Sequence, residues 1–267
     1  MDFLKREIGF KNRHGETLRG ILNSPATAMR GIPSGYGSIM LHGFKRNSTN
    51  EKKFMSLAES LSQKGVPSVQ LDYLGCGKSV SEGDFTLMTV EKLRQDVEDV
   101  LCQLPKATGI TKPTLVTHSL SGCVAVQSLE VSNDLNTRVL LLAPALNQQL
   151  LLRYWMIKGK RDKLKNLLEP ERLLQEASQI SSGEVIRHYG KFSHYARENV
   201  GRDYNPLLKG HINQVLHIHG GNDFSVPLSS VSVDFNHQII VPDGDHDLEA
   251  SSVLPLWIDA ATDFLTE

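Results

Sequence analysis

The stretch that decides the fold is Leu115-Val116-Thr117-His118-Ser119-Leu120-Ser121-Gly122-Cys123. Its β-branched, apolar start predicts a buried strand, and the small residues after Ser119 predict the closely packed start of a helix. A serine on so sharp a strand-to-helix turn is lifted clear of the sheet edge, where its hydroxyl can reach a substrate. The usual pattern of this turn, Gly-x-Ser-x-Gly, is only approximated, because Thr117 and Ser121 replace its glycines. A strand that happens to end at Thr-His-Ser would explain the stretch without any function, so the rest of the chain has to decide.

Strand and helix patterns alternate on both sides of this stretch. Apolar strand runs occur at 37–41, 66–72, 138–143, 214–219 and 238–241, with helical spacing at 50–65, 90–104 and 256–264. This alternation predicts a mostly parallel sheet with helices on both faces. A hairpin of residues 7–12 and 17–22 predicts an antiparallel edge. The alternation stops over residues 145–210, which we expect to form a helical lid inserted into a core of residues 1–144 and 211–267.

Two helix boundaries are also predicted from the sequence. Asn50 is expected to cap the first of these helices, because a short polar side chain can accept a hydrogen bond from the first turn. The last helix is expected to carry Leu256, Ala260 and Phe264, which recur at helical spacing.

Composition and charge argue against several classes of function. The chain has 267 residues and a formal net charge of −1, which gives no reason to expect a nucleic acid as partner. Its first residues lack the apolar core of a signal peptide, and no apolar run could cross a bilayer, so we expect no membrane span and a cytoplasmic location. Cys76, Cys102 and Cys123 are odd in number and widely spaced, which argues against a disulfide framework or a zinc cluster.

The residues suited to catalysis follow the predicted strands, and ligands of parallel α/β sheets bind beyond the carboxyl ends of the strands. One strand ends at His42-Gly43-Phe44, where the backbone N–H of Phe44 could point at an oxyanion together with the N–H of Leu120. A turn that glycine makes at little cost would explain the same residues equally well.

Two later strand ends supply an acid and a base. Asp223 ends the glycine-rich turn His219-Gly220-Gly221-Asn222-Asp223, and His246 follows the last strand. A serine hydroxyl is a weak nucleophile until a base accepts its proton, and the base needs a carboxylate to fix its tautomer. Asp223 alone would be explained as a turn residue. Ser119, Asp223 and His246 together have the chain order of a catalytic triad, and we predict that they form one.

Other polar patterns fit binding sites less well. Residues 72–79 lack the third glycine of a dinucleotide loop and the glycine spacing of a Walker loop. The aspartates at 243, 245 and 247 alternate as in a calcium loop, but leucines occupy the positions of its glycine and its glutamate. We therefore expect no cofactor and no metal. His217 is expected to be a hydrogen-bonded core residue, and His118 to point to the side of the turn opposite Ser119.

On these motifs the chain resembles the α/β-hydrolases, over nearly its whole length outside the insertion. Within that superfamily it is similar to small bacterial feruloyl (cinnamoyl) esterases and to serine-aminopeptidase-like hydrolases. The shared motifs are His42-Gly43-Phe44, Asp72-Tyr73-Leu74-Gly75-Cys76-Gly77-Lys78-Ser79, His118-Ser119, His219-Gly220-Gly221-Asn222-Asp223 and Asp245-His246-Asp247. The resemblance implies Ser119 as nucleophile, Asp223 as acid, His246 as base, and an oxyanion hole from Phe44 and Leu120. Leu120 stands where these esterases often carry glutamine, so a feruloyl substrate is not implied.

The insertion combines an apolar run, 150–157, with a basic run, 158–165. We expect Trp155 and Met156 to contact the substrate together with His42 and Gly43, although the apolar run could instead only pack the lid onto the core. The basic run could attract an acidic substrate or carrier, such as a phosphopantetheine thioester. We favour a solvated helix face, because charge runs are usually exposed.

The sequence therefore predicts a serine hydrolase that cleaves a carboxylic ester through a covalent acyl-enzyme. A thioesterase or an acyltransferase would use the same triad, and a hydrolase-fold protein that binds a ligand with little turnover could retain it. A dehalogenase or an epoxide hydrolase is disfavoured, because Ser119 rather than an aspartate occupies the turn. The expected partner is a small-molecule ester or thioester, and the sequence leaves open whether the chain forms a homodimer.

Overall fold

One sheet organises the chain. The computed structural model describes residues 3–25, 35–131, 138–163 and 169–267, and over these residues eight strands join in the order β1-β2-β4-β3-β5-β6-β7-β8. β2 pairs antiparallel with β1 and β4, and every other pair is parallel. The strands are β1 (Phe3–Lys11), β2 (Thr17–Pro25), β3 (Tyr36–Leu41), β4 (Ser68–Asp72), β5 (Lys112–His118), β6 (Val139–Leu142), β7 (Val215–Gly220) and β8 (His237–Val241). The predicted antiparallel edge and mostly parallel sheet are confirmed.

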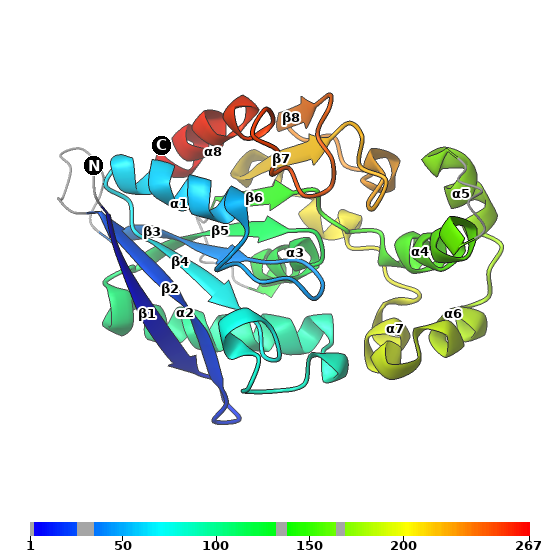
Figure 1. Ribbon diagram of the computed structural model, residues 1–267, viewed down its shortest axis with the longest axis horizontal. Helices are drawn as coiled ribbons and strands as arrows, with labels where there is room; N and C mark the ends of the chain where they lie inside the picture. The colour runs from blue at the N-terminus through cyan, green and yellow to red at the C-terminus, as the bar shows by residue number, and fades with distance from the viewer. Residues whose placement is uncertain (1–2, 26–34, 132–137, 164–168) are drawn as a thin grey trace.

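Helices cover both faces of the sheet (Figure 1). The helices are α1 (Lys52–Gln63), α2 (Val90–Thr108), α3 (Ser121–Val131), α4 (Gln148–Lys163), α5 (Pro170–Ala177), α6 (Ser182–Tyr189), α7 (Ser193–Asn199) and α8 (Ile258–Thr266). One apolar cluster joins α1 and α8 to the sheet, and a second joins α2 and α3 to its other face. The central strands are buried on both sides, which explains their continuous apolar runs.

The sequence of α2 shows how one of these helices is built. Thr89 accepts a hydrogen bond from the backbone N–H of Lys92 at 3.1 Å, which satisfies a donor of the first turn. Gly109 ends the helix with a φ of 81°, a left-handed conformation that glycine adopts without strain. Between these caps, Leu93 and Val97 belong to the face that is buried against the sheet.

The helices α4 to α7 lie beyond the carboxyl ends of the parallel strands, on the right of Figure 1. Arg153 of α4 holds this segment together, because its guanidinium donates to the carbonyl oxygens of Ile180 and Val200, both at 2.8 Å, and to the Ser182 hydroxyl at 3.0 Å. The segment is therefore a packed unit at the edge of the sheet where a site is expected.

Acidic residues neutralise the described part of the basic run. Within α4, Lys158 pairs with Asp162 at 3.0 Å. The other two ion pairs reach neighbouring helices: Lys160 to Glu184 at 3.5 Å and Arg161 to Glu176 at 2.8 Å. The Lys163 side chain and Lys165 fall outside the described residues. These pairs favour a helix face that faces solvent and other helices over an anion site.

Two predicted helix boundaries were wrong. Glu51, not Asn50, is the residue before the first turn of α1. Leu256 precedes α8 and is 57% exposed, while Ala260 faces solvent. Phe264 lies in α8 and is buried, as predicted, and the other apolar residues of the buried face are Ile258, Ala261 and Leu265. A three-residue spacing pattern this short does not fix where a helix starts.

Gly20 offers a test of the sheet. A Cβ atom at Gly20 would lie 2.2 Å from the backbone oxygen of Gln70 in β4, and backbone inside a sheet cannot move aside cheaply. We expect Gly20→Ala to lower the free energy of unfolding by about 2 kcal/mol or more, measured by urea denaturation. The matched control is Gly159→Ala in α4, where nothing lies within 4 Å of the added methyl. This control should be neutral or stabilising by up to about 1 kcal/mol. Equal effects at both positions would contradict the register of β2 and β4.

Candidate active site

Ser119 lies on the turn between β5 and α3 with a φ of 55°, in the left-handed region that a residue with a side chain rarely adopts. Three backbone hydrogen bonds hold it there: its N–H donates to Leu142 at 2.9 Å, and its carbonyl oxygen accepts from Gly122 and Ala145, both at 3.0 Å. The chain therefore stores local strain at the predicted nucleophile, as the strand-to-helix pattern requires.

Glycines make room for this turn. A Cβ atom at Gly43 would lie 3.0 Å from the Cβ of Ser119, and one at Gly122 would lie 2.8 Å from the Cβ of Pro144. Gly122 thus allows the close approach for which the usual pattern uses the position of Ser121. This is why the imperfect motif still forms the turn.

His246 and Asp223 are hydrogen-bonded, with 2.7 Å between Nδ1 of the ring and Oδ2 of the carboxylate. The backbone N–H groups of Ser225 and Val226 donate to the other carboxylate oxygen, both at 2.8 Å. Burial of Asp223 works against its charge, but the nearby His219 N–H and the hydrogen bond from His246 outweigh burial and lower the pKa of Asp223 to about 2. Asp223 is therefore a carboxylate at neutral pH, and it fixes the His246 ring with Nδ1 protonated and Nε2 free to accept a proton.

Ser119 and His246 line one cavity of about 310 Å³. Over the described residues, the Ser119 hydroxyl has no hydrogen-bond partner, so it is available to the imidazole or to a ligand. Catalytic hydrogen bonds often close only when substrate is bound. The structure thus brings the three predicted triad residues to one place, from three different loops of the chain.

Phe44 and Leu120 also border this cavity. Neither backbone N–H donates to another described residue, although most backbone N–H groups near a protein core are paired. Unpaired backbone donors at the same cavity as a serine hydroxyl are the kind of groups that can stabilise a developing oxyanion.

The far wall of the cavity is aromatic. It is formed by Phe44, Trp155, Tyr189 and Tyr195. The polar atoms of the last three are already used: Trp155 Nε1 donates to the Ser225 carbonyl oxygen, the Tyr189 hydroxyl to the Leu152 carbonyl oxygen, and the Tyr195 hydroxyl to Gln148. Leu152 and Gln148 are fully buried and do not border the cavity. The rings therefore present apolar surface to a ligand.

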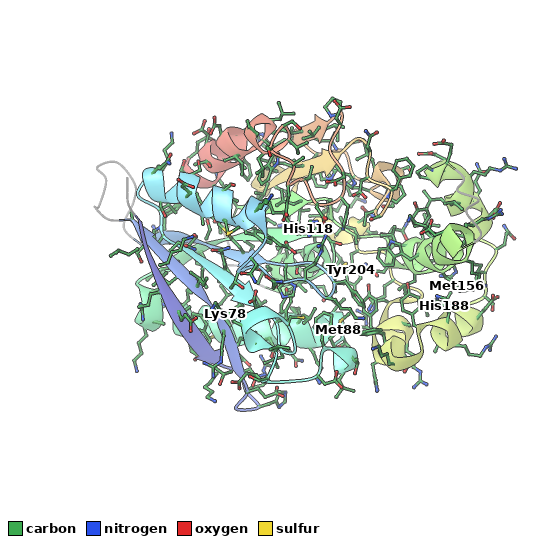
Figure 2. All side chains as sticks on the ribbon, in the orientation of Figure 1. Lys78, Met88, His118, Met156, His188 and Tyr204 are labelled. Carbon is green, nitrogen blue, oxygen red and sulfur yellow. The ribbon has the colours of Figure 1, made fainter. Side chains whose placement is uncertain are left out.

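Two predicted substrate contacts do not border the cavity. His42 is fully buried; its Nδ1 donates to the Gly43 carbonyl oxygen at 2.7 Å, and its Nε2 accepts from the Tyr73 N–H at 3.1 Å. Burial lowers the pKa of His42 to about 4, so the ring is neutral and shapes the turn that carries Phe44. Met156 is buried in the apolar core and does not border the cavity, and it lies well apart from His118 in Figure 2. Gly43 and Trp155, by contrast, border the cavity.

His118 corrects another expectation. It lies on the same side of the turn as Ser119 and borders the cavity. Its Nε2 donates to the backbone carbonyl oxygen of His246 at 2.9 Å, and the two rings lie 4.7 Å apart. Burial holds the pKa of His118 well below its usual value, so the ring is a neutral support for the loop that carries His246.

Sequence reasoning missed several residues of the cavity wall, including Arg46, Tyr189, Tyr195 and Val226. The two tyrosines come from α6 and α7, whose packing against the sheet edge has no signature in the local sequence. The Val226 position could have been found, because it lies three residues after Asp223 in the same turn.

A cluster of charged side chains, Lys53 with Glu51 and Glu249, connects α1 to the loop that carries His246. Lys53 is fully buried and pairs with Glu51 at 2.8 Å and with Glu249 at 3.0 Å. Burial raises the pKa of Glu51, and the Lys53 charge offsets part of this effect. Nearby, Arg46 forms an ion pair with Asp247, the residue after His246. The start of α1 is thereby tied to the loop that carries the predicted base.

Within the part of the chain that the structure describes, no three His, Cys, Asp or Glu side chains gather to hold a metal ion. Over the same residues, none of the helices is both long and apolar enough to span a membrane.

Comparisons with known proteins establish the fold. No protein-family model and no curated protein matches the chain. Solved structures do match: an esterase from Pyrococcus furiosus has a TM-score of 0.67 at 16% identity, over 98% of this chain and 90% of that one. Est1E from Butyrivibrio proteoclasticus, with ferulic acid bound, has a TM-score of 0.62 at 20% identity, over 96% and 97%. Alpha/beta hydrolase domain-containing protein 10 from mouse has a TM-score of 0.60 at 17% identity, over 97% and 98%. The chain has the α/β-hydrolase fold, as its sequence predicts.

The buried His217 gives a pH-dependent test of the folded site. Burial, with a smaller effect of His219, lowers the pKa of His217 to about 3, whereas the unfolded chain takes up this proton near pH 6.5. Between these values the unfolded state binds more protons, so stability falls as the pH falls. We expect His217→Gln to reduce this slope between pH 6 and pH 4 by about 1 kcal/mol per pH unit, measured by urea denaturation. An unchanged slope would show that His217 is protonated in the folded protein.

Proposed function

We propose that this protein is a serine hydrolase that cleaves a carboxylic ester through a covalent acyl-enzyme. The observation that carries the proposal is the convergence on one cavity of Ser119, on its left-handed turn, and the 2.7 Å His246–Asp223 pair. The unpaired N–H groups of Phe44 and Leu120 at the same cavity add the donors that such chemistry requires.

In the proposed acylation, Ser119 Oγ attacks the ester carbonyl carbon while His246 Nε2 takes the hydroxyl proton. The carbonyl oxygen becomes an oxyanion and accepts hydrogen bonds from the N–H groups of Phe44 and Leu120. The C–O bond to the alcohol then breaks, and the imidazolium returns its proton to the leaving oxygen. In deacylation, His246 takes a proton from water as the water oxygen attacks the acyl carbon. The bond to Ser119 Oγ then breaks, the imidazolium returns its proton to Oγ, and the acid is released.

Asp223 keeps its charge throughout this cycle. Its low pKa means that it remains a carboxylate while His246 is an imidazolium, so the pair gains attraction as the reaction proceeds. The backbone donors from Ser225 and Val226 keep the carboxylate oriented toward the ring.

Residues 145–210 are proposed to act as the lid that selects the acyl group. Trp155, Tyr189 and Tyr195 come from this segment, whereas the proposed triad and oxyanion donors do not. Because the polar atoms of these rings are bonded to protein, a polar group on the acyl chain would lose its hydrogen bonds to water without replacement. We therefore propose that the acyl group is apolar.

The esterases among the solved structures of the same fold support this reaction class. A thioesterase or acyltransferase with the same triad is the second candidate, because nothing in an apolar acyl site distinguishes an oxygen from a sulfur leaving group. A binding protein that retains the triad is the third, and it would keep the cavity without turnover.

Replacing the proposed nucleophile is the first test. Ser119→Ala should abolish labelling by a fluorophosphonate and lower kcat for p-nitrophenyl butyrate by about 10⁴-fold or more, because no other group can form the acyl-enzyme. Asp223→Asn should be nearly as damaging, because the His246 ring would lose its orienting acceptor.

The matched control is Ser128→Ala in α3, whose hydroxyl bonds only to the Val124 carbonyl oxygen, away from the cavity. It should keep both labelling and turnover. Wild-type labelling without turnover of any oxygen ester or thioester would favour the binding protein, and absence of labelling would exclude Ser119 as an activated nucleophile.

The lid proposal is tested by acyl preference. Trp155→Ala should change the ranking of kcat/KM among acetyl, butyryl, octanoyl and cinnamoyl esters by about 1–3 kcal/mol, and the acetyl ester should change least. Met156→Leu is the matched control, because Met156 is adjacent in sequence but does not border the cavity. If Trp155→Ala lowered all four activities in proportion while the protein stayed folded, Trp155 would serve the chemistry rather than the choice of acyl group.

A further inference from the structure

Three hydrogen bonds form a buried chain behind Asp223. Gln238 Nε2 lies 2.9 Å from His217 Nδ1, His217 Nε2 lies 3.0 Å from His219 Nδ1, and His219 Nε2 lies 2.8 Å from the Val226 carbonyl oxygen. Both imidazole rings are fully buried, and as residues i and i+2 of β7 they lie on the same face of the sheet. The proposed triad does not use either histidine.

The direction of this chain follows from its two ends. A carbonyl oxygen only accepts, so His219 Nε2 carries a proton. At the other end, the Gln238 amide nitrogen only donates, so His217 Nδ1 accepts and neutral His217 carries its proton on Nε2. His217 therefore donates from Nε2 to His219 Nδ1. With His217 neutral, as its low pKa requires, every tautomer is fixed and all the donors point toward the Asp223 turn.

The last donor also faces the proposed acid. His219 Nε2 lies 3.4 Å from Asp223 Oδ2, the same oxygen that accepts from His246 Nδ1 at 2.7 Å. The distance of 3.4 Å exceeds that of a good hydrogen bond, so the His219 N–H bonds to Val226 and acts on Asp223 mainly through its dipole. Two imidazole N–H groups therefore converge on one carboxylate oxygen that has no contact with solvent.

We propose that His217 and His219 are positioning residues for Asp223. His219 holds the Val226 carbonyl group, and with it the turn whose N–H groups donate to Asp223, while its own N–H dipole stabilises the carboxylate charge. His217 keeps His219 in the tautomer that does this. The catalytic consequence rests on the proposed function, whereas the tautomers do not.

The proposal predicts the sign of a pH effect. Without the His219 dipole, the Asp223 charge is less neutralised and attracts the His246 imidazolium more strongly, so the acid limb of the activity profile moves to higher pH. The other groups near His246 are the neutral His118 ring, at the end of β5, and the ion pair of Arg46 with Asp247, the residue after His246; none of them forms a hydrogen bond or an ion pair with His219. The turn is also less well held, so kcat falls.

The experiment compares His219→Leu with His219→Gln. Leucine fills the space without a donor, whereas the glutamine amide can donate in place of Nε2. For kcat/KM on p-nitrophenyl butyrate, His219→Leu should move the acid limb upward by about half a pH unit or more and lower kcat by about 10-fold or more. His219→Gln should restore most of both. A folded leucine variant with an unmoved limb, or a glutamine variant no better than leucine, would overturn the proposal.

A second variant keeps the proposal testable if His219→Leu does not fold. Gln238 is exposed, so Gln238→Leu removes the donor that locks His217 with little loss of packing. It should shift the acid limb in the same direction by a smaller amount. An acid limb at or below that of the wild type would count against the chain.

Nitrogen-15 NMR of the wild-type protein tests the tautomers without any turnover. The expected result at pH 7 is that His217 and His219 each carry a proton on Nε2 and none on Nδ1. An Nδ1-protonated or doubly protonated ring at either position would overturn the proposal. Correct tautomers in a protein that hydrolyses no ester would instead place the failure in the proposed function.

Discussion

The left-handed turn at Ser119 is the constraint on which the site depends. A side chain in that conformation is costly, and it persists only where surrounding contacts over-determine it. Here the neighbouring strand β6 and the chain after it supply those contacts, through Leu142 and Ala145, and Gly43 leaves the space beside it. Every other part of the site is placed relative to this turn, because the sheet fixes the carboxyl ends of the flanking strands at the same edge.

The loop that follows β3 is held in place by hydrogen bonds to a buried carboxylate. The buried Asp72, at the end of β4, accepts from the Ser48 N–H at 2.6 Å, the Thr49 hydroxyl at 2.7 Å and the Lys78 N–H at 2.8 Å. One carboxylate thus fixes two loops that have no strand partner of their own. The motif at residues 72–79 has a structural explanation in these bonds, since a Cβ at Gly77 would lie 2.1 Å from Asp72 Oδ2.

The sheet and the residues of the proposed triad could be predicted from the sequence, because both depend on local patterns. Buried parallel strands are continuous apolar runs, and Ser119, Asp223 and His246 each follow one directly. The aromatic wall of the cavity could not be predicted, because the positions of Tyr189 and Tyr195 depend on how the helices pack and not on spacing along the chain. The predicted direction of the His118 side chain was wrong for a related reason. Strand alternation predicts the direction of a side chain only while the backbone stays extended, and the left-handed turn begins at the next residue, Ser119.

The buried Lys53 has a consequence for the ionic conditions that the site tolerates. His246 lies on a loop outside the sheet, and the link from that loop to α1 is a lysine between two carboxylates rather than a backbone ladder. Surface ion pairs weaken as added salt screens them, but a pair without access to solvent is screened far less. The Lys53–Glu51 pair is buried, whereas the Glu249 side chain is 24% exposed and both partners of the Arg46–Asp247 pair are more exposed still. Added salt should therefore weaken the link to the loop of the proposed base more than the buried pair at the start of α1.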